Sequence, residues 1–270
     1  MTDIEKYEFD RQGYLVLPGF LGANETTRLA RAIDAVEEHA VARLTQPPRK
    51  KSAWNSEYHV NAEKGYHAGG ERKEGATVII EDFFNADPAF DLLVNHGPTM
   101  DFIRGIVQER PTINNSEIRI RYQGNQSHTH MGGPISGKYR YNYNAKGIDC
   151  MMVRMIYFTH DVGPEDGPFC VVPATHKSSL VSPYGTSDAN AEPGMLGLPV
   201  KAGAAILFTE NLRHGGLSIR SGQTRKTLHV GYGPFWMKSQ NISTMDEEQN
   251  IQPATLARYT PEQRMLFRSW

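Results

Sequence analysis

The chain has 270 residues, of which 39% are hydrophobic and 10% aromatic, so it can bury one substantial core. All-β folds of this length often form a single domain. Its 29 Lys and Arg against 30 Asp and Glu give a formal net charge of -1. This balance excludes a global positive field that would attract a nucleic-acid polymer or an anionic membrane surface. We therefore expect a small-molecule partner.

Cysteine usage and the N-terminus predict a cytoplasmic protein. The two cysteines, Cys150 and Cys170, both lie in apolar runs, which argues against a disulfide framework and favours a reducing compartment. Residues 1–14 lack the positive region and apolar core of a secretory signal, and no apolar run approaches the roughly 20 residues that cross a bilayer.

The part from residue 1 to about 115 is predicted to be rich in helices and loops. A strand over 13–21 ends in a Pro-Gly turn, and a helix over about 25–44 follows, because apolar residues recur there at intervals of three and four. Residues 46–75 are polar and basic with little periodicity, which predicts a long loop or lid. A strand at 77–80 and two short helices, over 88–93 and 100–107, complete this part.

The part from about 116 to 235 changes character, because short β-rich segments follow one another with turn residues between them. Such spacing favours a β-barrel or sandwich over βαβ units. Residues 236–270 are predicted as a C-terminal extension of the same single domain, 1–270. The predicted strands of the barrel core are 118–122, 150–158, 169–173, 204–208 and 226–232.

Two histidine-bearing segments lie where predicted strands meet glycine-rich turns. Residues 127–133 contain His128 and His130, and residues 211–216 contain His214. Imidazole is a common ligand of iron, copper, nickel and zinc, and two histidines with one carboxylate are typical of iron(II) oxygenases. Two-residue spacing is expected to put His128 and His130 on one face of an extended chain. Taken singly, each of these histidines could instead be a loop residue that hydrogen-bonds to the backbone and binds no metal.

Arg225 lies eleven residues after His214, at the start of a predicted strand. An arginine close to a metal can hold a carboxylate through two parallel hydrogen bonds, which lysine cannot imitate. Taken by itself, Arg225 is equally explained as a surface residue.

Several sequence segments follow one another in the order in which they occur in a known family, and the resemblance covers nearly the whole chain. Residues 9–21, 158–177 and 203–208, followed by His214 and Arg225, resemble the phytanoyl-CoA dioxygenase-like iron(II)/2-oxoglutarate oxygenases. The resemblance implies a mainly β fold, a double-stranded β-helix (jelly-roll, cupin-like) with flanking α-helices. It also implies that His214 is the distal iron ligand, that Arg225 pairs with 2-oxoglutarate, and that His176 is structural.

The proximal metal motif departs from that family. The usual His-x-Asp is absent, and His130-Met131-Gly132 is similar to the His-x-Gly variant of iron-dependent halogenases. We therefore expect His130 to be the proximal ligand, with Gly132 in the carboxylate position. His128 is either a third, neutral ligand or a residue that lies behind the ligands or faces the substrate, and Glu210 is an alternative source of the carboxylate.

A missing carboxylate leaves a coordination position that water or an exogenous anion such as chloride can fill. The segment that follows the proximal motif contains Lys138, Tyr139 and Arg140, which could stack on a flat ring and bind an anionic group. A solvated barrel loop explains these three residues equally well. We take them as candidate substrate residues for an anionic or aromatic small molecule.

The expected protein is thus an enzyme that uses Fe(II), 2-oxoglutarate and O2 to hydroxylate or chlorinate a substrate C–H bond, with the cofactor carrying the chemistry. Two alternatives stay open. The first is a barrel that has lost catalysis and binds a small molecule, and the second is a three-histidine metal enzyme that works without 2-oxoglutarate.

Overall fold

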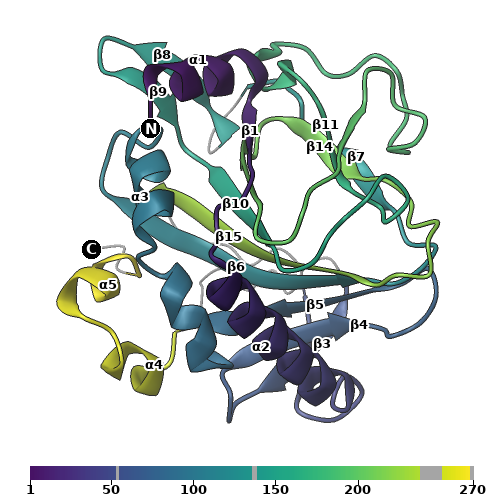
Figure 1. Ribbon diagram of the computed structural model, residues 1–270. Coiled ribbons are helices and arrows are strands. Elements are labelled where there is room, and N and C mark those ends of the chain that lie inside the picture. The colour runs from purple at the N-terminus through teal and green to yellow at the C-terminus, as the bar shows by residue number, and fades with distance from the viewer. Residues whose placement is uncertain (53–54, 136–138, 238–250, 268–270) are drawn as a thin grey trace.

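A computed structural model describes residues 1–52, 55–135, 139–237 and 251–267 of the chain. Two β-sheets pack on each other, and helices cover the other side of the larger sheet (Figure 1). The smaller sheet lies over one end of the larger one, where apolar residues of both sheets meet. This arrangement confirms the predicted mainly β fold of jelly-roll type with flanking helices.

The larger sheet has nine strands in the order β1-β13-β10-β15-β6-β5-β4-β3-β2. Its centre is built by β15 and β6, which pair antiparallel along almost their whole length. The strands are β1 (Tyr14–Leu17), β13 (Ala205–Thr209), β10 (Val153–Phe158), β15 (Arg225–Pro234), β6 (Pro111–Arg121), β5 (Thr77–Glu81), β4 (Tyr66–Gly70), β3 (Glu57–Asn61) and β2 (Arg49–Lys51).

The smaller sheet has four strands in the order β12-β11-β14-β7. A separate hairpin, β8-β9, lies beside α1 at one end of the molecule (Figure 1). The bounds are β12 (Leu196–Leu198), β11 (Phe169–Val172), β14 (Arg213–Gly216), β7 (Ser127–His130), β8 (Tyr141–Asn144) and β9 (Gly147–Cys150).

The helices flank the sheets. The described residues include no helix that is long and apolar enough to cross a membrane. The α-helices are α1 (Asp3–Gln12), α2 (Ala23–Val41), α3 (Gly97–Arg104), α4 (Pro253–Ala257) and α5 (Pro261–Met265), and the 3-10 helices are η1 (Phe83–Asn85), η2 (Pro88–Leu93) and η4 (Thr175–Lys177). Of these, α1 was not predicted, although Thr2 and Glu5 form a capping box at its start.

The predicted loop or lid over 46–75 is wrong, because its described residues include β2, β3 and β4, which extend the larger sheet. The outermost strand, Arg49–Lys51, is exposed at every residue. A charged edge strand of this kind lacks the apolar alternation that marks a half-buried strand, and it discourages pairing with other chains.

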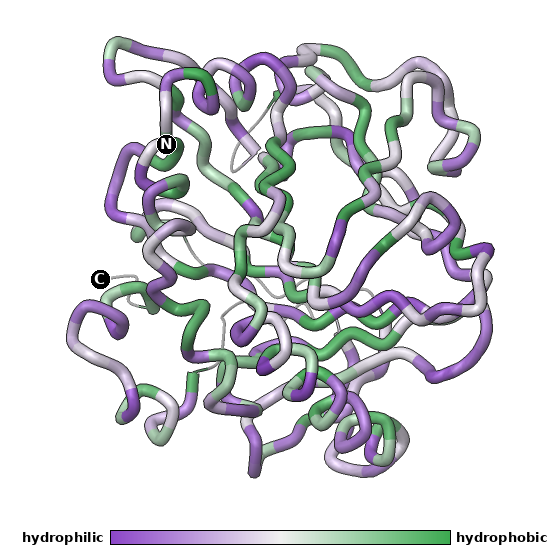
Figure 2. The backbone as a smooth tube through the Cα atoms, viewed as in Figure 1, coloured by the Kyte–Doolittle hydropathy of each residue, from purple (hydrophilic) through white to green (hydrophobic). Residues whose placement is uncertain are grey.

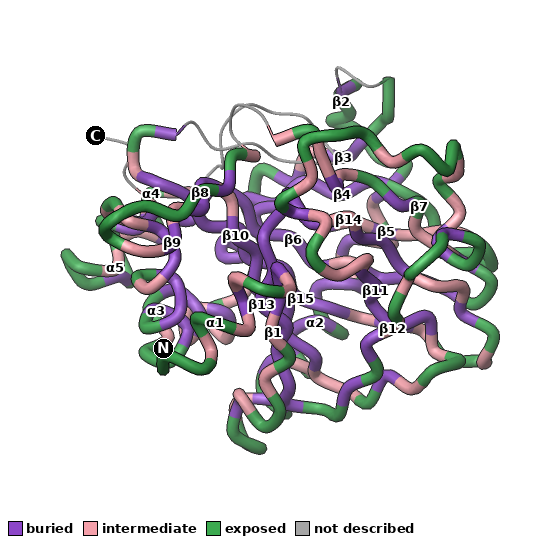
Figure 3. The backbone as a smooth tube through the Cα atoms, turned by 90° about the horizontal axis from the view of Figure 1, so that it is seen from above, coloured by how far each residue is buried: buried purple, intermediate pink, exposed green. Residues whose placement is uncertain are grey.

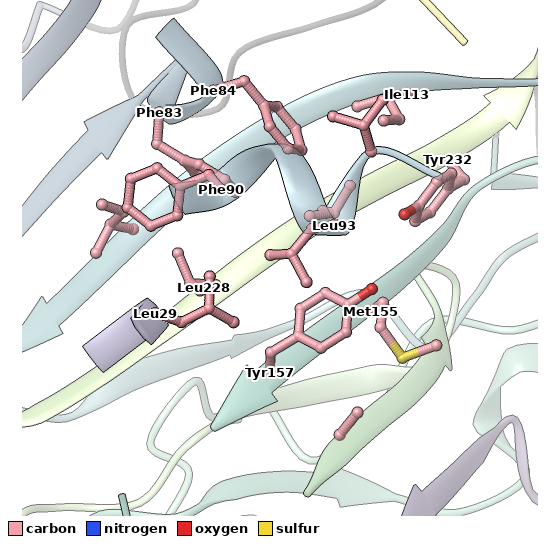
Figure 4. Close-up of a cluster of buried hydrophobic side chains, with 14 of the residues drawn as sticks. Leu29, Phe83, Phe84, Phe90, Leu93, Ile113, Met155, Tyr157, Leu228 and Tyr232 are labelled. Atoms are coloured by element: carbon pink, nitrogen blue, oxygen red, sulfur yellow. The ribbon is translucent and has the colours of Figure 1, made fainter. Parts of the chain in front are cut away.

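Central strands of the larger sheet are buried on both faces (Figure 3). On the face toward the helices, Leu228 of β15 lies opposite Ile118 of β6, and both belong to the main hydrophobic core. Figure 4 shows Leu29 of α2 and Phe90 of η2 packed toward this face. Full burial of such a side chain contributes about 1.5–3 kcal/mol, so the helix-covered face provides the main hydrophobic stabilisation.

The opposite face of the same strands is charged. Thr227 and His229 of β15 lie opposite Arg119 and Glu117 of β6, and Arg154 of β10 is 2% exposed. Hydrophilic and hydrophobic residues accordingly both occur along the strands in the middle of the molecule (Figure 2). Buried charges are costly unless they are paired or bind a ligand, so this charged face marks the place to look for a functional site.

Candidate active site

The two predicted metal histidines lie side by side on neighbouring strands of the smaller sheet. His130, at the end of β7, is the register partner of His214 in β14, and their ring centroids lie 4.1 Å apart. Both line one pocket with Arg119, Arg154, Glu210, Arg225 and His229. The structure therefore brings together the two histidines and the arginine that the sequence singled out.

Backbone carbonyl groups fix the orientation of both rings. Nδ1 of His214 lies 2.6 Å from the Leu212 carbonyl oxygen, and Nδ1 of His130 lies 3.1 Å from that of His128. A proton on Nδ1 can be donated to such a carbonyl, which leaves the Nε2 lone pair available to a metal. Each imidazole is thus prepared to bind through Nε2.

Both imidazoles are held in the neutral form that binds metals. Burial, and then the neighbouring imidazole of His130, lower the pKa of His214 to about 3. Loss of hydration around its ring also lowers the pKa of His130. A metal therefore need not displace a proton from either ring at neutral pH.

His128 does not line the pocket. Between the pairs His214–His130 and Gly216–Ser127, two steps along β14 match three steps along β7, which is a β-bulge. Ser127 and His130 both line the pocket as a result, whereas the expectation that residues 128 and 130 share a face fails. His128 and His130 are both exposed residues, so the pocket lining, which includes His130 alone of the two, is what leaves a role for His128 as a third ligand without support.

Gly132 also lies outside the pocket lining. The backbone turns away after His130 with positive φ at Met131, Gly132 and Gly133, a conformation that glycine adopts easily. A Cβ atom at position 132 would lie 2.5 Å from Cβ of Arg213, and its three nearest neighbours would all be carbons of that side chain. A side chain at 132 in this backbone would point toward Arg213.

Among the described residues, no group of three His, Cys, Asp or Glu side chains is placed to hold one metal ion. The acid of the pocket is Glu210, which receives a hydrogen bond from Nε of Arg154. The Arg154 guanidinium is the main influence that lowers the pKa of Glu210, to about 2, against the effect of burial. Glu210 is therefore an anion beside the two imidazoles, bound to Arg154.

Arg225 enters the pocket from the start of β15, 4% exposed. Its Nη1 donates a hydrogen bond of 2.6 Å to the Gly167 carbonyl oxygen, and its buried Nε has no hydrogen-bond partner among the described residues. Burial, together with the cations of Arg121 and Arg119, lowers the pKa of Arg225 well below its ordinary value. An anion bound here would relieve both the unpartnered donor and the crowding of like charges.

The neighbouring Arg121 has a different role. Its guanidinium is fully buried and donates to Asn125 Oδ1 and to the carbonyl oxygens of Gly167 and Leu217. These bonds hold the loops at the pocket edge together. Because Arg121 already satisfies its donors within the protein and does not line the pocket, Arg225 is the better candidate for binding a ligand.

The three candidate substrate residues have different surroundings in the structure. Lys138 lies outside the described residues. Burial, followed by the charge of Glu210, raises the pKa of Tyr139, but this residue does not line the pocket. Arg140 approaches Asp149 at 3.9 Å, and nearly half of its side chain is exposed.

His176 is part of the scaffold, as the sequence predicted. Its Nε2 lies 3.0 Å from the Asp10 carbonyl oxygen, and its ring centroid lies 4.6 Å from that of Tyr141. Burial, followed by the Lys177 cation, lowers the pKa of His176 to about 4. The residue joins α1 to the sheets.

Sequence reasoning missed Arg119, Arg154 and His229 as pocket residues. A usable signal existed for Arg154, since it is the one charged residue in the otherwise apolar run 150–158. A charge in the middle of a buried strand requires a partner or a ligand.

A comparison of the sequence with protein-family models matches residues 9–227 to the phytanoyl-CoA dioxygenase (PhyH) model. The chain belongs to the PhyH family. PhyH proteins are iron/2-oxoglutarate-dependent oxygenases, so the family part of the sequence prediction is confirmed. No curated protein is similar enough in sequence to match.

Solved structures share this PhyH fold. HygX from Streptomyces hygroscopicus, with nickel and 2-oxoglutarate bound, superposes with a TM-score of 0.71 at 19% identity, over 89% of this chain and 90% of that one. The carbocyclase SnoK from nogalamycin biosynthesis gives 0.59 at 16% identity, over 97% and 92%. EctD from S. alaskensis, with bound iron, gives 0.60 at 16% identity, over 93% and 85%.

Proposed function

We propose that this PhyH protein binds Fe(II) through Nε2 of His130 and His214 and holds 2-oxoglutarate through Arg225. The observation that carries the proposal is the presence, in one pocket, of two facing neutral imidazoles and a buried arginine with an unpartnered Nε. When bound, iron and 2-oxoglutarate would supply the oxidation of a substrate C–H bond by O2.

The protein's own residues would orient these groups and keep water out. The Leu212 and His128 carbonyl groups hold the imidazoles, and the fork of Arg225 suits a carboxylate. The rings of Phe169 and Phe208 line the pocket beside His214, where apolar surface excludes water from the reacting centre.

We propose further that an exogenous ligand completes the coordination. The described residues contain no third metal-binding side chain beside the histidines, and Glu210 is bound to Arg154. With water in that position the product would be hydroxylated by oxygen from O2, whereas chloride there would allow a chlorinated product. The lining holds three cations, Arg119, Arg154 and Arg225, against Glu210, and the buried Glu117 carboxylate pairs with the first two. The remaining excess of one cation favours an anion electrostatically.

The same charge excess supports an anionic small-molecule substrate. Nη1 and Nη2 of Arg119 make no hydrogen bond to the described residues, while its Nε donates to Glu117. Tyr139 stays the candidate aromatic residue for such a substrate. Small-molecule ligands also occur in similar structures: HygX has been solved with hygromycin B bound and SnoN with nogalamycin RO.

A barrel that binds a small molecule without catalysis is the second candidate, and the missing third ligand in the described residues favours it. Anaerobic addition of Fe(II) and 2-oxoglutarate separates the two. The enzyme should develop the visible charge-transfer band of the chelated complex, and the lack of this band in folded protein would contradict the proposed oxygenase.

A further inference from the structure

A buried ion pair lies directly behind the two metal histidines. Arg213, the residue before His214, donates from Nε to Glu192 Oε1 at 2.7 Å and from Nη2 to Glu192 Oε2 at 2.6 Å. The Arg213 side chain is 11% exposed and that of Glu192 is 1% exposed. A planar fork on a carboxylate is the most rigid ion pair that side chains form.

The same guanidinium also holds the strand of the other histidine. Nη2 donates to Thr129 Oγ1 at 3.0 Å, and Nη1 donates to the Met131 carbonyl oxygen at 3.3 Å. Thr129 and Met131 are the two chain neighbours of His130. A third bond, from Nη2 to the Thr186 carbonyl oxygen at 2.7 Å, fixes Arg213 to the segment that carries Glu192.

We propose that the Arg213–Glu192 pair positions the metal ligands by setting the distance between the His130 and His214 imidazoles. It also fills the space that a side chain at position 132 would need. This inference rests on the proposed function, because it concerns the same two imidazoles. Arg213 is a positioning residue, since it lies behind the histidines and is not part of the pocket lining.

The direction in which metal affinity changes in a variant of Arg213 distinguishes a positioning role from an effect of its charge alone. Replacing Arg213 by Met removes a cation and leaves the buried Glu192 carboxylate unbalanced, which by Coulomb's law would strengthen the binding of a metal cation. Loss of ligand geometry has the opposite effect, and removal of residues that orient metal ligands weakens metal binding about 10–100-fold. Weaker binding in Arg213→Met therefore indicates positioning.

The test is titration of Co(II) into the full-length apoprotein, followed by its visible spectrum, for the unmodified protein, Arg213→Met and Arg213→Lys. Lysine keeps the charge and loses the fork, so Arg213→Lys should also bind Co(II) more weakly, by a smaller factor. The matched control is Arg258→Met, which removes a two-point pair with Asp91 between α4 and η2. The control should retain Co(II) affinity.

Melting temperatures measured on the same samples show the loss of stability in each variant. Co(II) affinity in Arg213→Met and Arg213→Lys equal to that of the unmodified protein would overturn the positioning role while leaving the proposed metal site intact. Equal weakening in Arg258→Met would also overturn it, because a general loss of stability would then explain the result. An unmodified protein that binds no Co(II) would overturn both this inference and the proposed function.

Discussion

Replacement of Arg225 by Lys should weaken 2-oxoglutarate binding. Lysine can still reach a carbonyl oxygen such as that of Gly167, which Nη1 of Arg225 contacts at 2.6 Å. It cannot present a second parallel donor to a carboxylate. Loss of one charge-assisted hydrogen bond costs about 1.5–3 kcal/mol, which corresponds to roughly ten- to a hundredfold in affinity.

The introduced lysine should also make binding depend on pH. Arg225 is buried, and the cations of Arg121 and Arg119 act on it, so the same surroundings would lower the pKa of an ammonium group. Below that lowered pKa the lysine is charged and holds the anion; above it the charge and the binding are lost. Arginine starts from a higher ordinary pKa than lysine, so in the same surroundings the unmodified protein should keep its charge and its binding to a higher pH than the variant.

Anaerobic titration of 2-oxoglutarate into the Fe(II) protein, followed by its charge-transfer band at several pH values, provides the measurement. Arg258→Lys is the matched control, because Arg258 pairs with Asp91 and does not line the pocket. If Arg225→Lys binds 2-oxoglutarate as tightly as the unmodified protein at every pH, the co-substrate does not bind at Arg225 and the argument from burial and charge is refuted.

The other predictions test the metal and the scaffold. His130→Ala and His214→Ala should each lose iron and turnover, which metal analysis of the purified variants measures, and full iron retention in either would remove that residue from the site. If chloride completes the iron shell, mass spectrometry should find halogenated product with chloride or bromide present; purely oxygenated product at saturating halide would contradict this. Gly132→Asp should destabilise the protein, because its Cβ meets Arg213 at a positive φ, and should not suppress halide binding; normal stability together with lost halide binding would show that the carboxylate reaches the metal. His176 must stay uncharged when folded, so this residue should contribute a decrease of about 3 kcal/mol in the unfolding free energy as the pH falls from about 6.5 to about 4. Buried His214 adds to the same slope, so in denaturant titrations the slope of His176→Ala should be shallower than that of the unmodified protein by this contribution, and an unchanged slope would contradict the prediction.

Local patterns predicted those parts of the fold that bury one face. The spacing of apolar residues placed a helix at about 25–44, and the structure has α2 at Ala23–Val41. The strand at 77–80 corresponds to β5, Thr77–Glu81. Strand β2 was missed because it is exposed and charged and is held by hydrogen bonds to its neighbour. Strands β3 and β4 are mostly buried, but their polar and glycine residues interrupt the apolar alternation that marks a strand.

The sequence predicted the candidate site only where the position of a residue in a strand determines the direction of its side chain. His130 ends β7, Arg225 begins β15, and His214 in β14 is the register partner of His130; the stacking of the two sheets brings all three into one pocket. His128 was misplaced because the bulge in β7 changes the alternation of side chains. The Arg213–Glu192 pair joins residues 21 positions apart, and Glu192 lies outside the helices and strands, so no periodicity in the sequence reports this contact.

The separation of apolar and charged faces in the larger sheet affects how this protein can change over evolution. Stability comes mainly from the face that packs on the helices, where Leu228 and Ile118 meet. Substitutions on the pocket face, at residues such as Arg119, change ligand preference with little loss of hydrophobic burial. Under the proposed function, selection could therefore alter the ligand while conserving the scaffold.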